Sequence, residues 1–498
     1  MKRNNRQSLF DILTNPLFIL LSILILLLLT SLHYPMSNDE GMWSYIGRIW
    51  TWNRIPPYIG AMENKTPGIM ELFAISNILF GVNYIFVRVL GIIAVLLTSM
   101  IIYLIGKKLS GHLAGIFSML IFGFTMIWGF LDGQFPSQVE TFMVLFSSLA
   151  IYIIIIGVEN QKWKRWILLA GFMIGLAITF KQIAIFSFLG IAAFFIVYSA
   201  GRLTLKKRAA GLIILALGIM VSTFIFLIPL FASGVSIKDY IEGAWLILRH
   251  EGSRAPTTGF HVRNFFNTWG NTRLVVFYPF FALFLFLPGF IKNRYVIGLL
   301  LWLLFDFIGV NASGYYYGHQ IRQIVPSLSL IAGILTGNVL LKNINDEALL
   351  QKYASGLIIF IIIMLLPLQS LFLEIPQSLM RKSNYTEIGR WLKNNSKKDD
   401  YIYVGGIDGN PILAYSERVS PSKYFNYVFL RSDKDREILL NDLNAKKPLY
   451  FLKSKNPFEV GDKLDGFLKN NFTFNCSKGN FDIYKRNAET EIIRAKSD

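Results

Sequence analysis

Residues 12–50 read ILTNPLFILLSILILLLLTSLHYPMSNDEGMWSYIGRIW, and this stretch joins an apolar run to a segment rich in acidic and aromatic residues. The run at 12–32 is long enough to span a membrane, which takes about 20 mostly apolar residues. It follows the basic start Met-Lys-Arg-Asn-Asn-Arg but lacks a small-residue cleavage site, so we interpret it as an uncleaved anchor. The segment at 33–50 suits a helix at the membrane surface, with its aromatic rings among the headgroups.

The composition extends this interpretation to most of the chain. Hydrophobic residues make up 53% of the 498 residues and charged residues 16%, whereas soluble domains carry about 25% charged residues. The mean hydropathy is +0.47. The predicted fold is a mostly α-helical, polytopic transmembrane bundle of about eleven spans with a small soluble domain after it. The predicted spans are 12–32, 89–106, 113–131, 141–158, 166–180, 182–201, 209–237, 274–291, 295–312, 323–341 and 354–373.

The short basic connectors all fall on one side of the membrane if residues 69–80 are interfacial rather than spanning. Because lysine and arginine are retained on the cytoplasmic side, the N-terminus is predicted to be cytoplasmic. The net charge of +18 has the same explanation, so we predict no nucleic-acid partner. The basic connectors are residues 107–108, 162–165, 202–208, 292–294 and 342, and the outer side receives residues 33–83, 132–140, 233–273, 311–322 and the tail from 374.

The tail is predicted to form an extracytoplasmic α/β domain over 374–498, after a transmembrane domain over 1–373. No phosphate loop, metal-ligand spacing or nucleophile motif occurs in it, so we interpret it as a structural or acceptor-docking domain. The single Cys476 excludes an intramolecular disulfide. The predicted elements are helices at 384–397 and 433–446, strands at 401–407 and 448–452, and a hairpin turn at 477–480.

Three motifs in the first outer loop, 33–83, carry a resemblance to a known family. They are Asp39-Glu40-Gly41, Arg54-Ile55-Pro56-Pro57-Tyr58 and Asn64-Lys65-Thr66-Pro67-Gly68. Their order resembles that in the dolichyl-phosphate-mannose protein mannosyltransferases and their bacterial relatives, including the lipid A aminoarabinose transferases. The similarity continues through Arg88, residues 175–181 and residues 315–319, and covers about the first 340 residues. Thr66 stands where the family usually has proline.

The resemblance implies a C-type integral-membrane glycosyltransferase. Such an enzyme moves a sugar from a polyprenyl-phosphate donor, with inversion, to a hydroxyl of a lipid, glycan or protein acceptor at the outer face of the bilayer. The richness in isoleucine, lysine and asparagine favours the plasma membrane of a prokaryote. The resemblance implies no definite cofactor and leaves a divalent metal open.

The resemblance also suggests roles for individual residues. Asp39 is expected to be the catalytic base, with Glu40 beside it and Glu140 as a second acid. Lys65 is expected to hold the donor phosphate. Further candidates for phosphate binding are Lys181, His319 and Tyr317, and Glu63 is a candidate metal ligand.

Each of these residues also has a simpler interpretation. Asp39 and Glu140 both lie where an acid caps or opens a helix. Lys65 and Lys181 suit lysines that extend from an apolar surface to water. His319 and Tyr317 suit an ordinary buried histidine and an interfacial tyrosine. Asp132 is a weaker candidate acid, which also suits a turn. His250 and His261 are candidate metal ligands, which also suit solvated loop residues. Asp306, within its span, is interpreted as part of a structural ion pair.

Three other functions compete with transfer from a lipid donor. A transporter or flippase of lipid-linked sugars would show related halves with broken helices, and the sequence has no such halves. A polysaccharide polymerase or ligase is supported only by the long loop at 233–273. An oligosaccharyltransferase of the same architecture would carry a Trp-Trp-Asp motif in its tail, and this tail has none.

The predicted orientation is tested by reporter fusions. A reporter that is active only outside the cytoplasm should be active after Asp498 and silent after Lys108, because basic connectors stay inside. A silent fusion after Asp498 would mean that the number of spans is wrong by one.

Overall fold

The computed structural model describes residues 16–127, 135–246, 292–312, 318–343, 383–456 and 462–487, together with residues 376 and 380. These residues form two compact units. The membrane unit comprises described residues of 16–34, 88–227 and 292–343. The loop–tail unit comprises described residues of 35–87, 228–246 and 383–487. The predicted boundary at 373 follows chain order, whereas the loop–tail unit groups the first outer loop with the tail.

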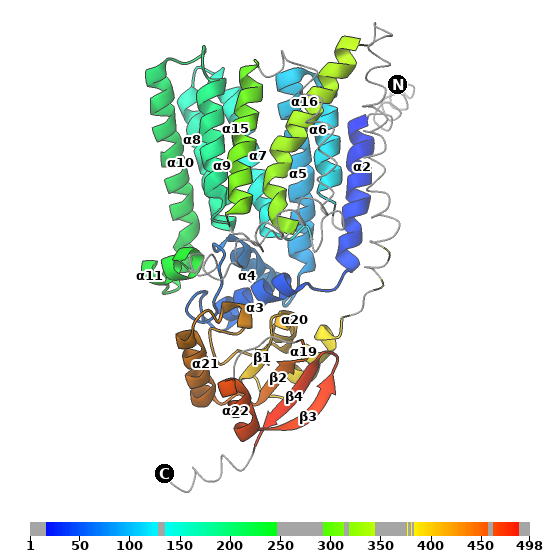
Figure 1. The fold of residues 1–498 in the computed structure, drawn as a ribbon, viewed down its shortest axis with the longest axis vertical. Coiled ribbons are helices and arrows are strands. Elements are labelled where there is room, and N and C mark those ends of the chain that lie inside the picture. Colours follow the sequence, from blue (N-terminus) through cyan, green and yellow to red (C-terminus); the bar gives the residue numbers. More distant parts are fainter. Residues whose placement is uncertain are drawn as a thin grey trace, which may run out of the picture. The chain divides into compact units, whose positions relative to one another are not determined.

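Apolar helices build the membrane unit (Figure 1). Five described helices are long and apolar enough to cross a membrane: α5 (Ile85–Ser110), α7 (Val139–Val158), α8 (Trp163–Phe180), α10 (Leu205–Ala232) and α15 (Arg294–Asn311). The unit also contains α2 (Pro16–Leu29), η1 (Thr30–His33), α6 (His112–Thr125), α9 (Ala184–Tyr198), η4 (Gly318–Ile324) and α16 (Val325–Asn343). Nine predicted spans coincide with helices in this set, and those at 274–291 and 354–373 lie outside the described residues. The count of eleven spans stays a prediction.

Close backbone approach holds some of these helices together. The largest helix–helix contacts join α7 with α8, α9 with α15, and α6 with α16. At Gly333 of α16, a Cβ atom would lie 2.3 Å from the backbone nitrogen of Ser118 in α6. Small residues at such positions let helices pack tightly in lipid, where no hydrophobic effect separates one apolar surface from another.

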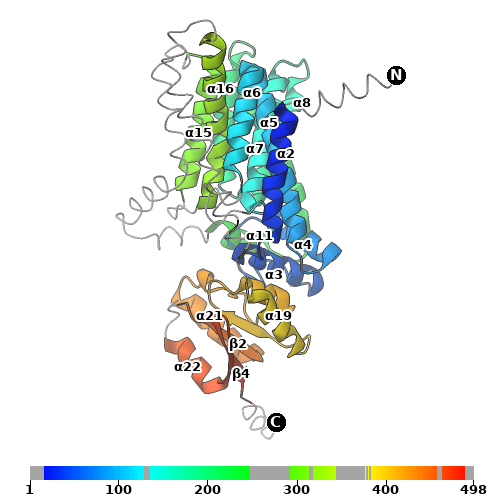
Figure 2. The ribbon, with the colours of Figure 1, turned by 90° about the vertical axis from the view of Figure 1, so that its right-hand side faces the viewer.

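The tail contributes a four-stranded sheet with the strand order β1-β2-β4-β3 (Figure 1). Figure 2 shows β2 and β4 of this sheet from the side. β1 (Ile402–Gly405) and β2 (Tyr450–Ser454) are parallel, and β4 (Phe481–Arg486) is antiparallel to both β2 and β3 (Phe472–Lys478). The predicted hairpin is confirmed, and its turn contains Gly479 at a φ of 55°, a conformation that suits glycine.

The helices of the tail agree in part with the sequence. The predicted helices correspond to α19 (Tyr385–Asn394) and α21 (Asp433–Lys446). The sequence analysis missed α20 (Asn410–Ser416) and α22 (Asp462–Asn471). A 3-10 turn, η6 (Tyr427–Phe429), completes the described tail.

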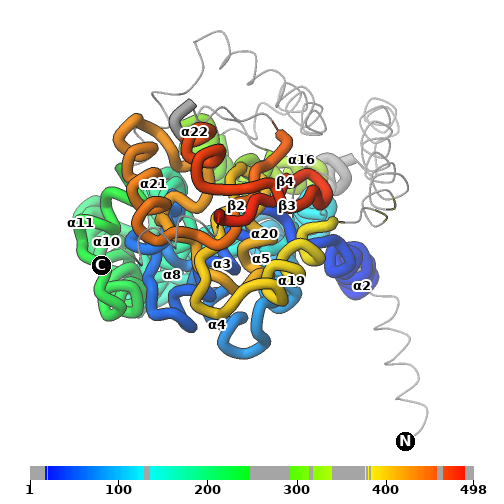
Figure 3. The backbone as a smooth tube through the Cα atoms, turned by 90° about the horizontal axis from the view of Figure 1, so that it is seen from below, coloured from blue at the N-terminus to red at the C-terminus, as the bar shows by residue number. Residues whose placement is uncertain are grey.

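The first outer loop belongs to the same unit as the sheet. It forms α3 (Asn38–Trp52) and α4 (Gly68–Phe80), and α3 packs against both α4 and α20 (Figure 3). Two short helical turns, α11 (Ile237–Tyr240) and η2 (Ile241–Leu246), also belong to this unit.

Candidate active site

A capping box starts α3 and places the first candidate acid. The Ser37 hydroxyl accepts a hydrogen bond from the Glu40 backbone N–H at 3.3 Å, and the Glu40 carboxylate accepts one from the Ser37 N–H at 2.8 Å. This reciprocal pair satisfies two N–H groups that the helix itself leaves unpaired. Glu40 is fully buried and completes the capping box of Ser37, while Asp39 is partly exposed on the same first turn. These two neighbouring acids, which the sequence analysis named together, therefore differ in burial.

A hydrogen bond between Tyr58 and Lys65 closes the loop that carries Lys65. The Tyr58 hydroxyl donates to the Lys65 carbonyl at 2.6 Å, and Tyr58 itself has a φ of 66°. A bulky residue in the left-handed region is strained, and such strain persists only where the surroundings hold it. The buried Tyr58 ring packs edge-on against Tyr240, with their centroids 5.9 Å apart. The conformation of this loop is thus held by hydrogen bonding and by packing of the Tyr58 ring.

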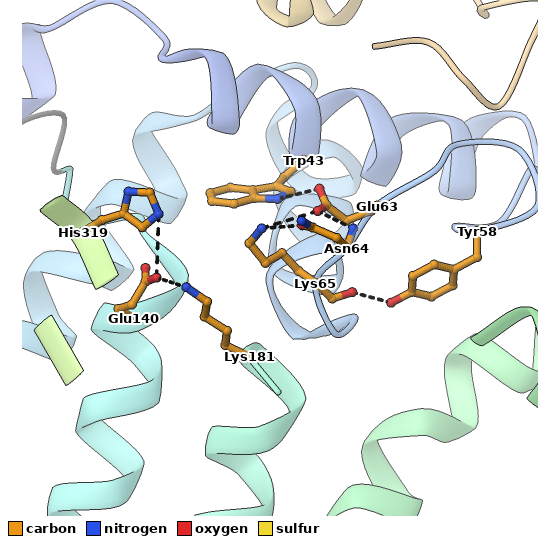
Figure 4. A network of polar contacts seen from close by, with 8 residues as sticks. All are labelled: Trp43, Tyr58, Glu63, Asn64, Lys65, Glu140, Lys181 and His319. Carbon is orange, nitrogen blue, oxygen red and sulfur yellow. Dashed lines mark hydrogen bonds and ion pairs between the residues drawn. The ribbon is translucent and has the colours of Figure 1, made fainter. Parts of the chain in front are cut away.

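A buried carboxylate, that of Glu63, links this loop to α3. Its Oε2 accepts from the Trp43 indole N–H at 3.1 Å, and its Oε1 accepts from the Asn64 backbone N–H at 2.8 Å. The Lys65 ammonium lies 3.8 Å from Oε1 and donates to the Asn64 side-chain oxygen. Figure 4 shows Trp43, Glu63, Asn64 and Lys65 converging in this way. The Lys65 side chain remains 19% exposed, whereas the Glu63 side chain is fully buried.

Charge at Glu63 is balanced by its neighbours. Burial raises the pKa of its carboxyl above the ordinary value, and the Lys65 charge opposes that rise. The negative charge of Asp39 adds to the rise, so Asp39 is electrostatically coupled to this group. Glu63 was a candidate metal ligand, but the described residues contain no group of three His, Cys, Asp or Glu side chains suited to a metal ion. Both of its oxygens accept hydrogen bonds that fix the loop.

The membrane unit contains a second polar cluster around Glu140 (Figure 4). Glu140 lies in the first turn of α7 and is fully buried. The Lys181 ammonium, at the end of α8, donates to Glu140 Oε1 in a buried ion pair. His319 Nε2 lies 4.0 Å from the same oxygen. The three residues, which the sequence analysis treated separately, therefore form one cluster.

One oxygen of this cluster remains available. Among the residues that the structure describes, Glu140 Oε2 is buried without a hydrogen-bond partner. An unpaired buried carboxylate oxygen is unfavourable unless a ligand or water satisfies it. The cluster can therefore accept a further donor.

Two buried arginines, to which the sequence analysis gave no role, form hydrogen bonds within the membrane unit. Arg322 of η4 donates to the Phe135 carbonyl at 3.0 Å and to the Thr141 hydroxyl beside Glu140. Arg88 of α5 donates to the Ser31 and Tyr34 carbonyls, at 2.5 and 2.6 Å. Its guanidinium also lies 4.4 Å from the centre of the Phe135 ring. The only sequence signal for such a role is a basic residue next to an apolar run.

The expectation of an ion pair at Asp306 was wrong for the described residues. Asp306 Oδ1 accepts from the Ser187 hydroxyl at 2.6 Å and from the Gln323 amide at 3.0 Å. These neutral donors satisfy Oδ1 of the buried acid without a counter-charge. Several other candidates lie outside the described residues, namely Asp132, His250, His261 and Tyr317.

Residues 64–226 match the model of the dolichyl-phosphate-mannose-protein mannosyltransferase family. The structure of ArnT from Cupriavidus metallidurans bound to undecaprenyl phosphate superposes with a TM-score of 0.63 at 12% identity, over 94% of this chain and 98% of that one. The chain has the C-type membrane glycosyltransferase fold. The resemblance expected from the sequence is confirmed.

A second solved structure shares this glycosyltransferase fold. It is the archaeal oligosaccharyltransferase AglB from Archaeoglobus fulgidus in complex with an inhibitory peptide and a dolichol-phosphate. Its TM-score is 0.52 at 12% identity, over 95% of this chain and 74% of that one. No curated protein sequence gives a significant match.

The buried pair of Glu140 and Lys181 yields a stability prediction. Lys181→Met should lower the free energy of unfolding by about 3–5 kcal/mol, because it leaves a buried carboxylate without its counter-charge. Glu140→Gln combined with Lys181→Met should recover most of that loss, because no charge of the pair then remains. Thermal melting of the purified protein in detergent measures both. If Lys181→Met alone melts like wild type, the lysine is not needed to neutralise Glu140.

Proposed function

We propose that this protein transfers a sugar from a polyprenyl-phosphate donor to an acceptor hydroxyl at the extracytoplasmic face of a membrane. The observation that carries the proposal is that a partly exposed acid, Asp39, and a partly exposed lysine, Lys65, both act electrostatically on the buried Glu63 carboxyl and lie on one frame. That frame is α3 and the loop fixed to it through Glu63. Support also comes from the fold, which is shared with ArnT bound to undecaprenyl phosphate.

In the proposed reaction Asp39 acts as the base. Its carboxylate takes the proton of the acceptor hydroxyl while that oxygen attacks the anomeric carbon of the sugar. The bond from the anomeric carbon to the phosphate oxygen breaks on the opposite face, and its electron pair stays on the phosphate. The product is inverted at the anomeric carbon, and the proton remains on Asp39. A phosphate leaves without a dedicated acid, so a single carboxylate is sufficient, unlike in most glycoside hydrolases.

Lys65 is proposed to hold the departing phosphate. Negative charge on the phosphate grows as the bond breaks, so a fixed cation stabilises the transition state more than the bound donor. Glu63 and Asn64 hold the ammonium in place before the donor arrives. A pre-oriented charge needs no reorganisation during the reaction, which is the main source of such stabilisation.

The cluster of Glu140, Lys181 and His319 is proposed to bind polar substrate groups in the membrane unit. Lys181 and Glu140 neutralise one another, so this cluster favours a sugar hydroxyl or a singly charged group over a bare phosphate. The unsatisfied Glu140 Oε2 is suited to accept from a hydroxyl. The donor sugar is proposed to be a hexose such as mannose, or a pentose.

The donor is identified by comparing cells with and without the protein. Mass spectrometry of membrane lipids and surface glycans should show one polyprenyl-phosphate sugar accumulating, and one glycan lost, in its absence. That lipid then serves as substrate for the purified protein. Unchanged lipids and glycans would contradict the proposed function.

The role of Asp39 is tested by Asp39→Asn, which keeps the size of the side chain and removes its charge. Turnover should fall by about 10²–10⁴-fold, as for loss of a general base, while melting changes little. Asp433→Asn is the matched control, because Asp433 is also a first-turn acid of a helix with a capping box, α21. Turnover near the wild-type rate in Asp39→Asn would remove Asp39 from the mechanism.

The role of Lys65 is tested by Lys65→Ala and Lys65→Arg. Alanine should weaken binding of undecaprenyl phosphate and also lower the transfer rate, and arginine should rescue only in part because its planar fork places charge differently. Lys453→Ala is the control for loss of a partly exposed lysine in an ion pair, here with Asp465. A lysine that only extends to water would tolerate both changes. Lipid-linked sugar that crosses liposomes without cleavage, equally in wild type and variants, would favour a flippase.

A further inference from the structure

We propose that residues 407–423 of the tail, here called the clamp segment, position Asp39 for the reaction, with Asn410 and Tyr45 as positioning residues. The inference rests on the proposed function, because it concerns the same base. It gives the tail a part in catalysis without placing a catalytic residue there. All contacts that support it lie within the loop–tail unit.

The start of α3 is bonded to the clamp segment at the residue next to Asp39. The Asn38 side chain donates to the Ile407 carbonyl at 2.5 Å and accepts from the Asn410 N–H at 3.2 Å. The Asn410 side chain donates to the Asn38 carbonyl at 3.3 Å. Asn426 donates to Asn410 Oδ1 at 3.0 Å and so orients the amide. The helix turn that carries Asp39 is therefore held through both the backbone and the side chain of its neighbour.

A steric contact holds the other side of Asp39. At Gly41 a Cβ atom would lie 2.4 Å from the backbone nitrogen of Pro411, so α3 and the start of α20 touch backbone to backbone. Asp39 lies between this contact and the bonded Asn38 along the chain. Its backbone cannot shift toward the tail without a clash or away from it without breaking those bonds.

Two buried polar side chains fix the remainder of α3. The Tyr45 hydroxyl accepts from the Ser420 N–H at 2.9 Å, and the Arg48 guanidinium donates to the Arg418 carbonyl at 2.6 Å. Both α3 side chains are almost fully buried. Burial lowers the pKa of Arg48 to about 10, so it remains charged at neutral pH. Removing either bond leaves a buried backbone group unsatisfied.

The same segment also reaches the loop of Lys65. The Lys423 carbonyl accepts from the Met62 N–H at 2.9 Å, next to Glu63. One continuous segment thus bonds both elements that carry the proposed site. A displacement of a reacting group by about 1 Å can lower the rate about 10²-fold. Bonds that hold these two elements in place are therefore expected to affect the rate.

The test combines Tyr45→Phe with Asn410→Ala, which removes side-chain bonds between α3 and the clamp segment and leaves every proposed catalytic residue intact. The control combines Tyr403→Phe with Asn471→Ala. Tyr403 is an equally buried tyrosine whose hydroxyl donates to the Tyr424 carbonyl at 3.0 Å, and Asn471 donates to the Phe467 carbonyl at 2.9 Å. Both control bonds lie within the tail.

The expected result is a split between kcat and KM. In the test variant kcat should fall by about tenfold or more, with KM for the lipid donor within about twofold of wild type, because the Met62–Lys423 bond is untouched. The loss should vanish in an Asp39→Asn background, since there is then no base to position. Hydrogen exchange at the amides of 38–48 should be faster than in the control variant.

Two outcomes overturn the inference. One is a kcat equal to that of the control variant, with unchanged exchange over 38–48. The other is that, when the test substitutions are combined with Asp39→Asn, the fold-losses in kcat of the two variants multiply. That result is expected if the two changes act independently. Failure of the proposed function is seen separately, as wild-type turnover by Asp39→Asn alone.

Discussion

The buried carboxylate of Glu63 is the interaction on which the proposed site depends. It accepts the Trp43 indole N–H from α3 and the Asn64 N–H from the loop, and it faces the Lys65 ammonium. A buried charge is tolerated only when it is paired and hydrogen-bonded. The Lys65 charge partly offsets the desolvation of the carboxylate, and the carboxylate in turn fixes the position of Lys65. One buried group therefore sets both the place of the lysine and its distance from α3.

In the membrane unit, the buried charged side chains have different kinds of partner. Arg88 and Arg322 each use backbone carbonyls near helix ends, so their charges are solvated by the chain itself. Asp306 accepts at Oδ1 from a hydroxyl and an amide. In the cluster around Glu140, the buried acid is paired instead with the Lys181 ammonium. Each polar group is tied to two or more helices, which links helices that lipid alone would not hold together.

Local sequence patterns predicted most elements because apolar runs and alternating strands are properties of neighbouring residues. Asp39 and Lys65 could be proposed from sequence because their motifs, close together in one loop, resemble those of a known family. The meeting of Glu140 with Lys181 and His319 could not, since a lone charge beside an apolar run does not identify its partner. The capping-box role of Glu40 was also open to prediction, because Ser37-x-x-Glu40 is a capping-box pattern. Asp306 was misjudged because neutral donors leave no charge pattern.

The bonds between α3 and the clamp segment join residues about 370 positions apart, as at Asn38 and Ile407. During synthesis α3 is made long before its partners in the tail. Tyr45 and Arg48 therefore lack their hydrogen-bond partners Ser420 and Arg418 until the membrane helices have been inserted and residues 407–423 have been synthesised. Contacts of such long range form late, because the entropy of closing the intervening chain is lost first. The order of assembly thus makes completion of the proposed site one of the last events in the biogenesis of the protein.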